Sequence, residues 1–339
     1  MPTAVHVVAL SSDGLAGFFP FEGTSSTYTR ADMKRDETTL KGTGTVSRFL
    51  MSNSGHATIT RLDRKLVYGL DIPRAEYTAC PLTGCAQPAP PPQQREPQQP
   101  GSSREPECKM KVASNTFNVK PTAQRKAING FDTEQYAVDW TVAFEDPNKR
   151  RSTFQLTMDL WTTPVTPALR DAMAMEANYA RAAVAAYTAA ERSAAAGAGG
   201  AGPGGGVLPQ QFMDMMNRYF GQSMTAADRA ALFNIGRQME RIKGQPIVTT
   251  LRLFFSGNAC GGAEEGSAGA GGAGPGGIAG AISGLFGRGS SSSSGGASSA
   301  AGGDKPLLSF TQEVKAWKVE PVRDSQFVPP PQFKRRNAG

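Results

Sequence analysis

The chain has 339 residues, a formal net charge of +7 and 39% hydrophobic residues, so its length allows one large domain or two ordinary ones. No uninterrupted apolar run approaches the roughly 20 residues of a membrane-spanning helix, which argues against an integral helical membrane protein. Most Gly and Pro residues lie in three segments whose composition cannot form a core. We therefore predict a single domain over residues 1–336, interrupted by low-complexity insertions at residues 86–107, 194–206 and 258–304.

Basic residues are densest at residues 149–151 and 334–336. Neither cluster alternates with the aromatic side chains on which single-stranded nucleic acid stacks. The first cluster follows a turn-like Asp-Pro-Asn and the second lies near the C-terminus. We interpret both as solvated ends and expect no nucleic-acid partner.

The first part of the chain is predicted to form short strands separated by turn residues, at residues 4–10, 24–30, 34–40, 56–62 and 65–70. Two later strands show strict alternation of apolar residues, which places each apolar set on one face of its strand. The first set is Tyr136, Val138, Trp140, Val142 and Phe144, and the second is Phe154, Leu156, Met158 and Leu160. The charged, turn-like segment between them predicts an antiparallel pair.

Helices are expected next. Thr166 and Pro167 provide an N-cap followed by Pro at the first helical position, and apolar residues recur every three or four positions up to about Arg192. A second helix is predicted from Pro209 to Phe220 and a third from Thr225 to Ile242.

Alternating strands resume at residues 247–255 and 308–316. Strands in runs, rather than alternating with helices, favour an antiparallel sheet over a parallel α/β fold. We therefore predict an α+β fold in which a strongly curved antiparallel sheet forms a half-barrel and helices cover its concave side.

The four cysteines, Cys80, Cys85, Cys108 and Cys260, do not have the spacing of a zinc site. Two disulfides, most simply Cys80–Cys85 and Cys108–Cys260, would imply an oxidising compartment. Four reduced thiols in a cytosolic protein are the alternative. The first residues do not resemble a secretory signal peptide, so the sequence leaves a removed signal, a misassigned start and a cytosolic protein as alternatives.

Groups for catalysis are scarce. Neither His6 nor His56 lies near a Ser or Cys in a recognisable nucleophile motif, and the glycine-rich segments do not lead from a strand into a helix as phosphate-binding loops do. We expect no catalytic residues, no metal, no cofactor and no enzymatic activity.

The alternating apolar residues are candidates for the lining of a ligand cavity, with Met-rich helices packed over them. An ordinary hydrophobic core is the alternative for each of them. The candidates are Tyr136, Val138, Trp140, Val142, Phe154, Leu156, Met158, Met215, Met216, Leu251 and Leu253.

Several segments, in this order along the chain, resemble bacterial envelope proteins of the LolA/LolB-like superfamily, the outer-membrane lipoprotein carriers, and more closely an uncharacterised branch of it. The segments are residues 22–30 (EGTSSTYTR), 57–68 (ATITRLDRKLVY), 76–78 (EYT), 128–136 (INGFDTEQY), 243–252 (KGQPIVTTLR) and 327–333 (FVPPPQF). The resemblance implies a bent antiparallel sheet with helices in its concave side, and a periplasmic or outer-membrane location. In the carriers the concavity holds the acyl chains of lipoproteins.

The function expected from the sequence is therefore that of a non-enzymatic envelope protein, which binds a lipid or another apolar ligand in a half-barrel cavity. Its partner would be a lipid or an acylated protein, and it would be peripheral to a membrane at most. The alternative is a structural or protein-interaction module of the envelope with a filled core and no ligand.

Overall fold

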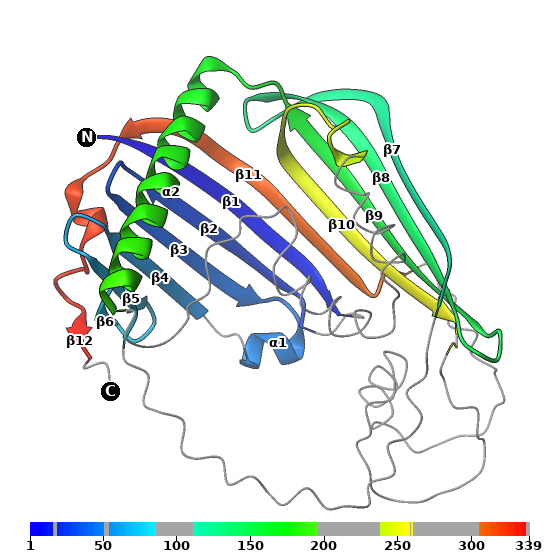
Figure 1. Cartoon of the computed structure of the whole chain (residues 1–339), viewed down its shortest axis with the longest axis horizontal. Helices are drawn as coiled ribbons and strands as arrows, with labels where there is room; N and C mark the ends of the chain where they lie inside the picture. The colour runs from blue at the N-terminus through cyan, green and yellow to red at the C-terminus, as the bar shows by residue number, and fades with distance from the viewer. Residues whose placement is uncertain are drawn as a thin grey trace, which may run out of the picture.

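A computed structural model describes residues 1–15, 19–50, 54–85, 111–194, 238–257, 259 and 305–336. About 60% of the structure is strand, and all of these strands belong to one sheet (Figure 1). Its strands are β1 (Pro2–Leu15), β2 (Phe21–Thr29), β3 (Met33–Gly42), β4 (Ser54–Arg61), β5 (Leu66–Asp71), β6 (Glu76–Pro81), β7 (Lys111–Ile128), β8 (Phe131–Glu145), β9 (Arg151–Thr163), β10 (Gln245–Gly257), β11 (Leu308–Pro321) and β12 (Lys334–Arg335). Each strand predicted from alternation or turn spacing corresponds to one of these, with at most one residue outside it at one end.

The sheet has twelve strands in the order β12-β6-β5-β4-β3-β2-β1-β11-β10-β9-β8-β7. Neighbouring strands are antiparallel except β12 and β6, which are parallel, so the sheet is mixed. β1 pairs with β11 from Pro2↔Pro321 to Leu15↔Leu308, so the first strand of the chain lies beside a late strand in the middle of the sheet. The predicted antiparallel pairing of the two strongly alternating strands is confirmed by β8 and β9.

The predicted α+β fold, a strongly curved antiparallel half-barrel with helices covering its concave side, is wrong. The sheet is large and not strongly curled, and the helices among the described residues do not cover it. Twelve strands spaced about 4.8 Å apart make a sheet ~50 Å wide. The two described α-helices, α1 (Thr45–Leu50) and α2 (Pro167–Ala194), contact mainly four of these strands: α2 lies against β11, β1 and β2, and α1 against β3.

Helix α2 confirms the prediction made from the Thr-Pro pair. The Thr166 hydroxyl accepts a hydrogen bond from the backbone N–H of Leu169 at 3.3 Å, which is the geometry of an N-cap. The helix crosses β11, β1 and β2 (Figure 1) and buries Leu169, Ala172, Tyr179 and Ala183. The predicted helix at residues 209–220 lies outside the described residues, as does most of the one at residues 225–242.

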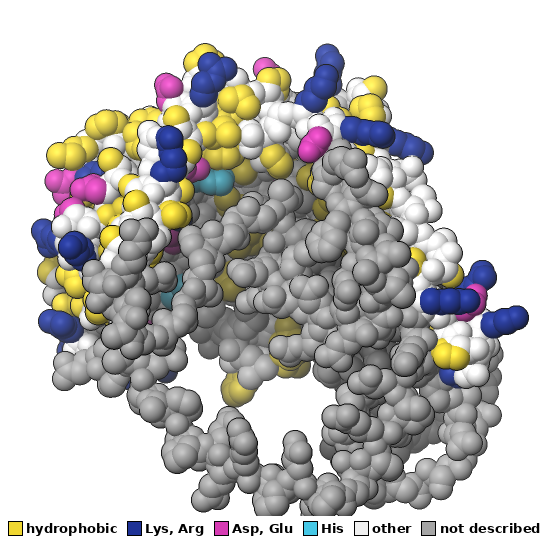
Figure 2. Space-filling model, viewed as in Figure 1, with side chains coloured by type: hydrophobic (Ala, Val, Ile, Leu, Met, Phe, Trp, Pro, Cys, Tyr) yellow, Lys and Arg dark blue, Asp and Glu magenta, His cyan; other side chains and the backbone are white. Residues whose placement is uncertain are grey.

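We call the face on which α2 lies the inner face and the opposite one the outer face. Trp317 of β11 donates a hydrogen bond to Glu176 of α2 and pairs with His6, so His6 lies on the inner face. Ser12 lies on the same face of β1 by alternation. It pairs with Phe310 of β11, which in turn pairs with Leu251 of β10. The alternating apolar residues of β8–β10 therefore belong to the inner face. Figure 2 shows this side of the molecule, with hydrophobic, Lys and Arg side chains visible around its upper and left edges.

On β4 and β5 the apolar residues lie on the outer face instead. Ala57, Ile59 and Leu70 form a buried cluster with Phe327 of the short 3-10 helix η1 (Asp324–Phe327). We call residues 322–327 the C-terminal strap. The apolar side therefore changes from inner to outer across the sheet, and the strap supplies the cover for the outer cluster.

Three buried arginines hold the strap against the sheet. The guanidinium of Arg30 donates to the Val322 carbonyl, that of Arg35 to the Gln326 carbonyl at 3.2 Å and that of Arg61 to the Phe327 carbonyl at 3.3 Å. A guanidinium has five donors in a fixed fork, so each arginine can bind the strap and a second group together. Arg35 also binds Glu37 and Arg61 binds Asp63, which balances their charges.

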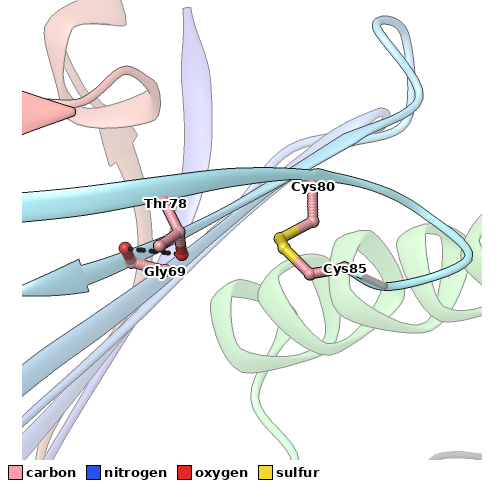
Figure 3. The surroundings of a disulfide bond; sticks show 4 residues. All are labelled: Gly69, Thr78, Cys80 and Cys85. Atoms are coloured by element: carbon pink, nitrogen blue, oxygen red, sulfur yellow. Dashed lines mark hydrogen bonds between the residues drawn. A yellow bond between two sulfur atoms is a disulfide. The ribbon is translucent and has the colours of Figure 1, made fainter. Parts of the chain in front are cut away.

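A disulfide joins Cys80 to Cys85, with Cα atoms 4.8 Å apart, and confirms one of the two predicted pairs (Figure 3). It closes a short loop at the end of β6. Cys108 and Cys260 lie outside the described residues, so the second pair stays a prediction.

Reduction of the Cys80–Cys85 disulfide is expected to lower the free energy of unfolding by about 2 kcal/mol, because the bond restricts only a six-residue loop in the unfolded chain. The measurement is urea unfolding of the oxidised and reduced protein, in a chain with Cys108→Ser and Cys260→Ser. Identical unfolding midpoints would contradict a stabilising role for this bond.

Candidate functional site

The structure brings together all the sequence-predicted cavity residues that it describes. They form a single buried cluster on the inner face of β8, β9 and β10, which we call the inner apolar surface. Each of its members is 7% exposed or less. The cluster comprises Tyr136, Val138, Trp140, Val142, Phe144, Phe154, Leu156, Met158, Leu160, Leu251 and Leu253. Phe144 and Leu160 belong to it although they were not among the cavity candidates. Met215 and Met216 lie outside the described residues.

Cross-strand register makes this surface continuous. Val138 of β8 pairs with Met158 of β9, which pairs with Leu251 of β10. One step along the strands, Trp140 pairs with Leu156, which pairs with Leu253. Because directly opposed side chains on one face touch, the three strands present unbroken rows of apolar groups.

The aromatic residues of the surface are held in fixed orientations. The Trp140 indole N–H donates to Asn115 Oδ1 at 2.9 Å, and the Trp140 ring lies edge-on to Phe154 with centroids 5.5 Å apart. The Tyr136 hydroxyl donates to Glu134 Oε1 at 3.1 Å. Burial and this hydrogen bond raise the pKa of the Tyr136 hydroxyl, so it stays protonated and neutral.

Part of the cover of this surface lies in the described residues. Met239 and Ile242, just before β10, pack on it, as do Val112, Phe117 and Val119 of the neighbouring strand β7. A Met side chain adapts readily to the shape of its neighbours. The surface can therefore bind apolar groups, while it offers no charged side chain for acid–base chemistry.

A second group of interacting side chains, which sequence reasoning missed, lies between α2 and the sheet. The His6 and Trp317 rings stack with centroids 4.3 Å apart, and the indole N–H of Trp317 donates to Glu176 Oε1 at 3.2 Å. His6 Nε2 is buried without a hydrogen-bond partner. Lys34 and Asp36 of β3 act electrostatically on Glu176. No local motif marks this group, because its members come from four separate elements.

Burial dominates the electrostatics under α2. It lowers the pKa of His6 to about 4, with a further contribution from the positive charge of Lys34. It raises the pKa of the Glu176 carboxyl, an effect that the hydrogen bond from Trp317 and the charge of Lys34 offset only in part. Both groups therefore favour their neutral forms in the folded protein.

The stability of the protein should consequently depend on His6 between pH 6.5 and pH 4. The unfolded chain protonates His6 near pH 6.5 and the folded chain near pH 4, so the folded state loses stability as the pH falls through this window. We expect His6 to cost about 3 kcal/mol between pH 7 and pH 4. His6→Phe keeps a ring against Trp317 but cannot be protonated. Urea unfolding of the protein and of this variant at each pH gives the difference between their unfolding free energies, and the change of that difference with pH is the cost of His6. A difference that does not change with pH would contradict the lowered pKa of His6 in the folded protein.

Comparisons with known proteins return nothing: no family model, no curated protein and no solved structure matches the chain. The resemblance to the lipoprotein-carrier superfamily therefore stays a prediction. Among the described residues, no helix is both long and apolar enough to cross a membrane, and no group of three or more His, Cys, Asp or Glu could hold a metal ion.

Proposed function

We propose that the protein binds an apolar ligand, such as a lipid or an acyl chain, against the inner apolar surface. The observation that supports this most is the continuity of that surface across β8, β9 and β10. Its side chains contain only two nitrogen or oxygen atoms, the Trp140 indole nitrogen and the Tyr136 hydroxyl, and both have partners within the protein. An acyl chain would leave no polar group unsatisfied there.

Binding would require the cover to move. Met239 and Ile242 lie at the end of the segment that leads into β10, and the Ile242 N–H bonds to the Met239 carbonyl at 3.0 Å in a turn. A ligand that displaces them exchanges one apolar contact for another. The net free energy of binding would then come from the extra apolar area buried, at roughly 25 cal/mol per Å².

The proposed location is the bacterial envelope, peripheral to a membrane. The Cys80–Cys85 disulfide supports it, because such bonds persist in oxidising compartments such as the periplasm. The resemblance to lipoprotein carriers points in the same direction.

Native mass spectrometry of protein purified from the envelope fraction of its own host, followed by solvent extraction, tests this proposal. We expect a co-purifying lipid mass. Leu253→Ala should reduce the bound fraction several-fold, whereas Phe254→Ala, which changes the next residue on the opposite face of β10, should not. Circular dichroism would verify that both variants fold.

The second candidate is a structural or protein-interaction module without a ligand. The low exposure of every member of the inner apolar surface favours it, because a filled core has this property. If the same preparation shows only the mass of the protein without a bound ligand, this would support the structural or protein-interaction role and contradict lipid binding.

A further inference from the structure

A shallow, open cleft, lined by apolar groups and by several polar side chains, lies at the opposite end of the sheet from the inner apolar surface. It has a volume of about 510 Å³, within the range of small-molecule sites, and is formed by β4, β5, β6 and the end of the chain. Its polar side chains include His56, Thr58, Asp71, Glu76, Thr78 and Arg336. We call it the polar cleft.

The strand register arranges these side chains in two rows on one face. His56 pairs with Asp71, which pairs with Glu76, and in the next row Thr58 pairs with Gly69, which pairs with Thr78. Gly69 leaves a gap in the second row: a Cβ added there would lie 3.2 Å from the Thr78 hydroxyl oxygen. The gap makes room for a ligand group between two threonine hydroxyls.

The chain's C-terminal segment completes the cleft. The backbone N–H of Lys334 bonds to the Ala75 carbonyl and that of Arg336 to the Tyr77 carbonyl, both at 2.8 Å. This pairing brings the Arg336 guanidinium to within 3.5 Å of Glu76. The other carboxylate, Asp71, lies 3.4 Å from Arg74.

Each carboxylate of the cleft therefore has a guanidinium partner, Arg336 in the lining and Arg74 just outside it, and the charges of these four side chains balance. An anion such as a phosphate would have to compete with Glu76 for Arg336, and a cation would have to compete with Arg74 or Arg336. A neutral ligand rich in hydroxyl groups can instead donate to the carboxylates and exchange hydrogen bonds with the threonines. We propose that the polar cleft binds a neutral polyol or saccharide.

Saturation-transfer NMR on the full chain tests this second site independently of the apolar one. The probes are three neutral trisaccharides, maltotriose, cellotriose and mannotriose, with glucose 1-phosphate and glucosamine as charged comparisons. We expect transfer to at least one neutral trisaccharide, and weaker transfer to both charged sugars.

Gly69→Val should weaken that binding tenfold or more, because the branched side chain fills the gap beside Thr78. Val suits a strand, so the fold should persist. The matched control is Thr24→Val, at an exposed position of β2 outside the cleft, which should bind as the unchanged protein does. Absence of transfer to all three neutral sugars, stronger transfer to a charged one or insensitivity to Gly69→Val would overturn the proposal.

Discussion

Replacing Phe327 with Ala is expected to lower the free energy of unfolding by about 3–5 kcal/mol. The Phe327 side chain is fully buried, and it fills the outer-face cluster formed by Ala57, Ile59 and Leu70. The guanidinium carbon of Arg30 also lies 4.5 Å from the centre of its ring. The substitution therefore leaves a cavity and removes a cation–π contact in the same place.

Urea unfolding followed by circular dichroism measures this loss. The matched control is Phe49→Ala on α1, because Phe49 is 84% exposed and its loss should change stability by only about 0.5 kcal/mol or less. Equal effects of the two substitutions would show that the strap is not part of the folded core.

Replacing Arg30 with Met is expected to cost about 2–4 kcal/mol, because several hydrogen bonds from a buried charge are lost at once. Arg30 is 4% exposed, and its guanidinium binds the Thr3 hydroxyl at 2.9 Å, the Asp324 carboxylate at 2.6 Å and the Val322 carbonyl. Met keeps much of the side-chain volume, so the effect reports mainly on these bonds. It should couple with Phe327→Ala, since the two side chains touch.

Arg64→Met is the control for the Arg30 substitution. Arg64 is 55% exposed and lies 3.9 Å from Asp63, so this surface ion pair should contribute about 1 kcal/mol or less. Limited proteolysis of the C-terminal segment gives a second readout, with faster cleavage expected only for Arg30→Met. Similar stability and cleavage in both variants would refute the role of Arg30 as an anchor of the strap.

Local patterns in the sequence predicted most of the individual elements. Alternation over residues 136–144 and 154–160 identified β8 and β9 and placed their apolar side chains on one face, because the pleat of a strand has a period of two. Thr166 followed by Pro167 identified the start of α2. These signals depend only on neighbouring residues.

The features that local patterns missed depend on contacts between distant residues. Curvature is set by the tilt and pairing of all twelve strands, so alternation could not reveal that the sheet stays open. The change of the apolar side from inner to outer needs the strap, whose Phe327 lies 266 positions from Arg61. The group under α2 joins His6 to Glu176 and Trp317, again far apart in the chain.

The candidate site was predicted in part. The members of the inner apolar surface on β8–β10 followed from alternation, and the structure places them together. The polar cleft had no such signal, because it consists of single Thr, His and acidic residues in three strands and of Arg336 near the C-terminus. Only the register of β4, β5 and β6 brings these residues to one face.

Fluorescence quenching by a brominated fatty acid tests apolar-ligand binding at the inner apolar surface most directly. The chain has three Trp residues, so two single-Trp proteins suffice: Trp161→Phe with Trp317→Phe leaves Trp140 on the inner apolar surface. Trp140→Phe with Trp317→Phe leaves Trp161, which follows Leu160 on β9 and so lies on the outer face. Binding at the inner apolar surface predicts saturable quenching of Trp140 by 9,10-dibromostearate and little quenching of Trp161. Absence of quenching at Trp140, or equal quenching of both, would contradict it.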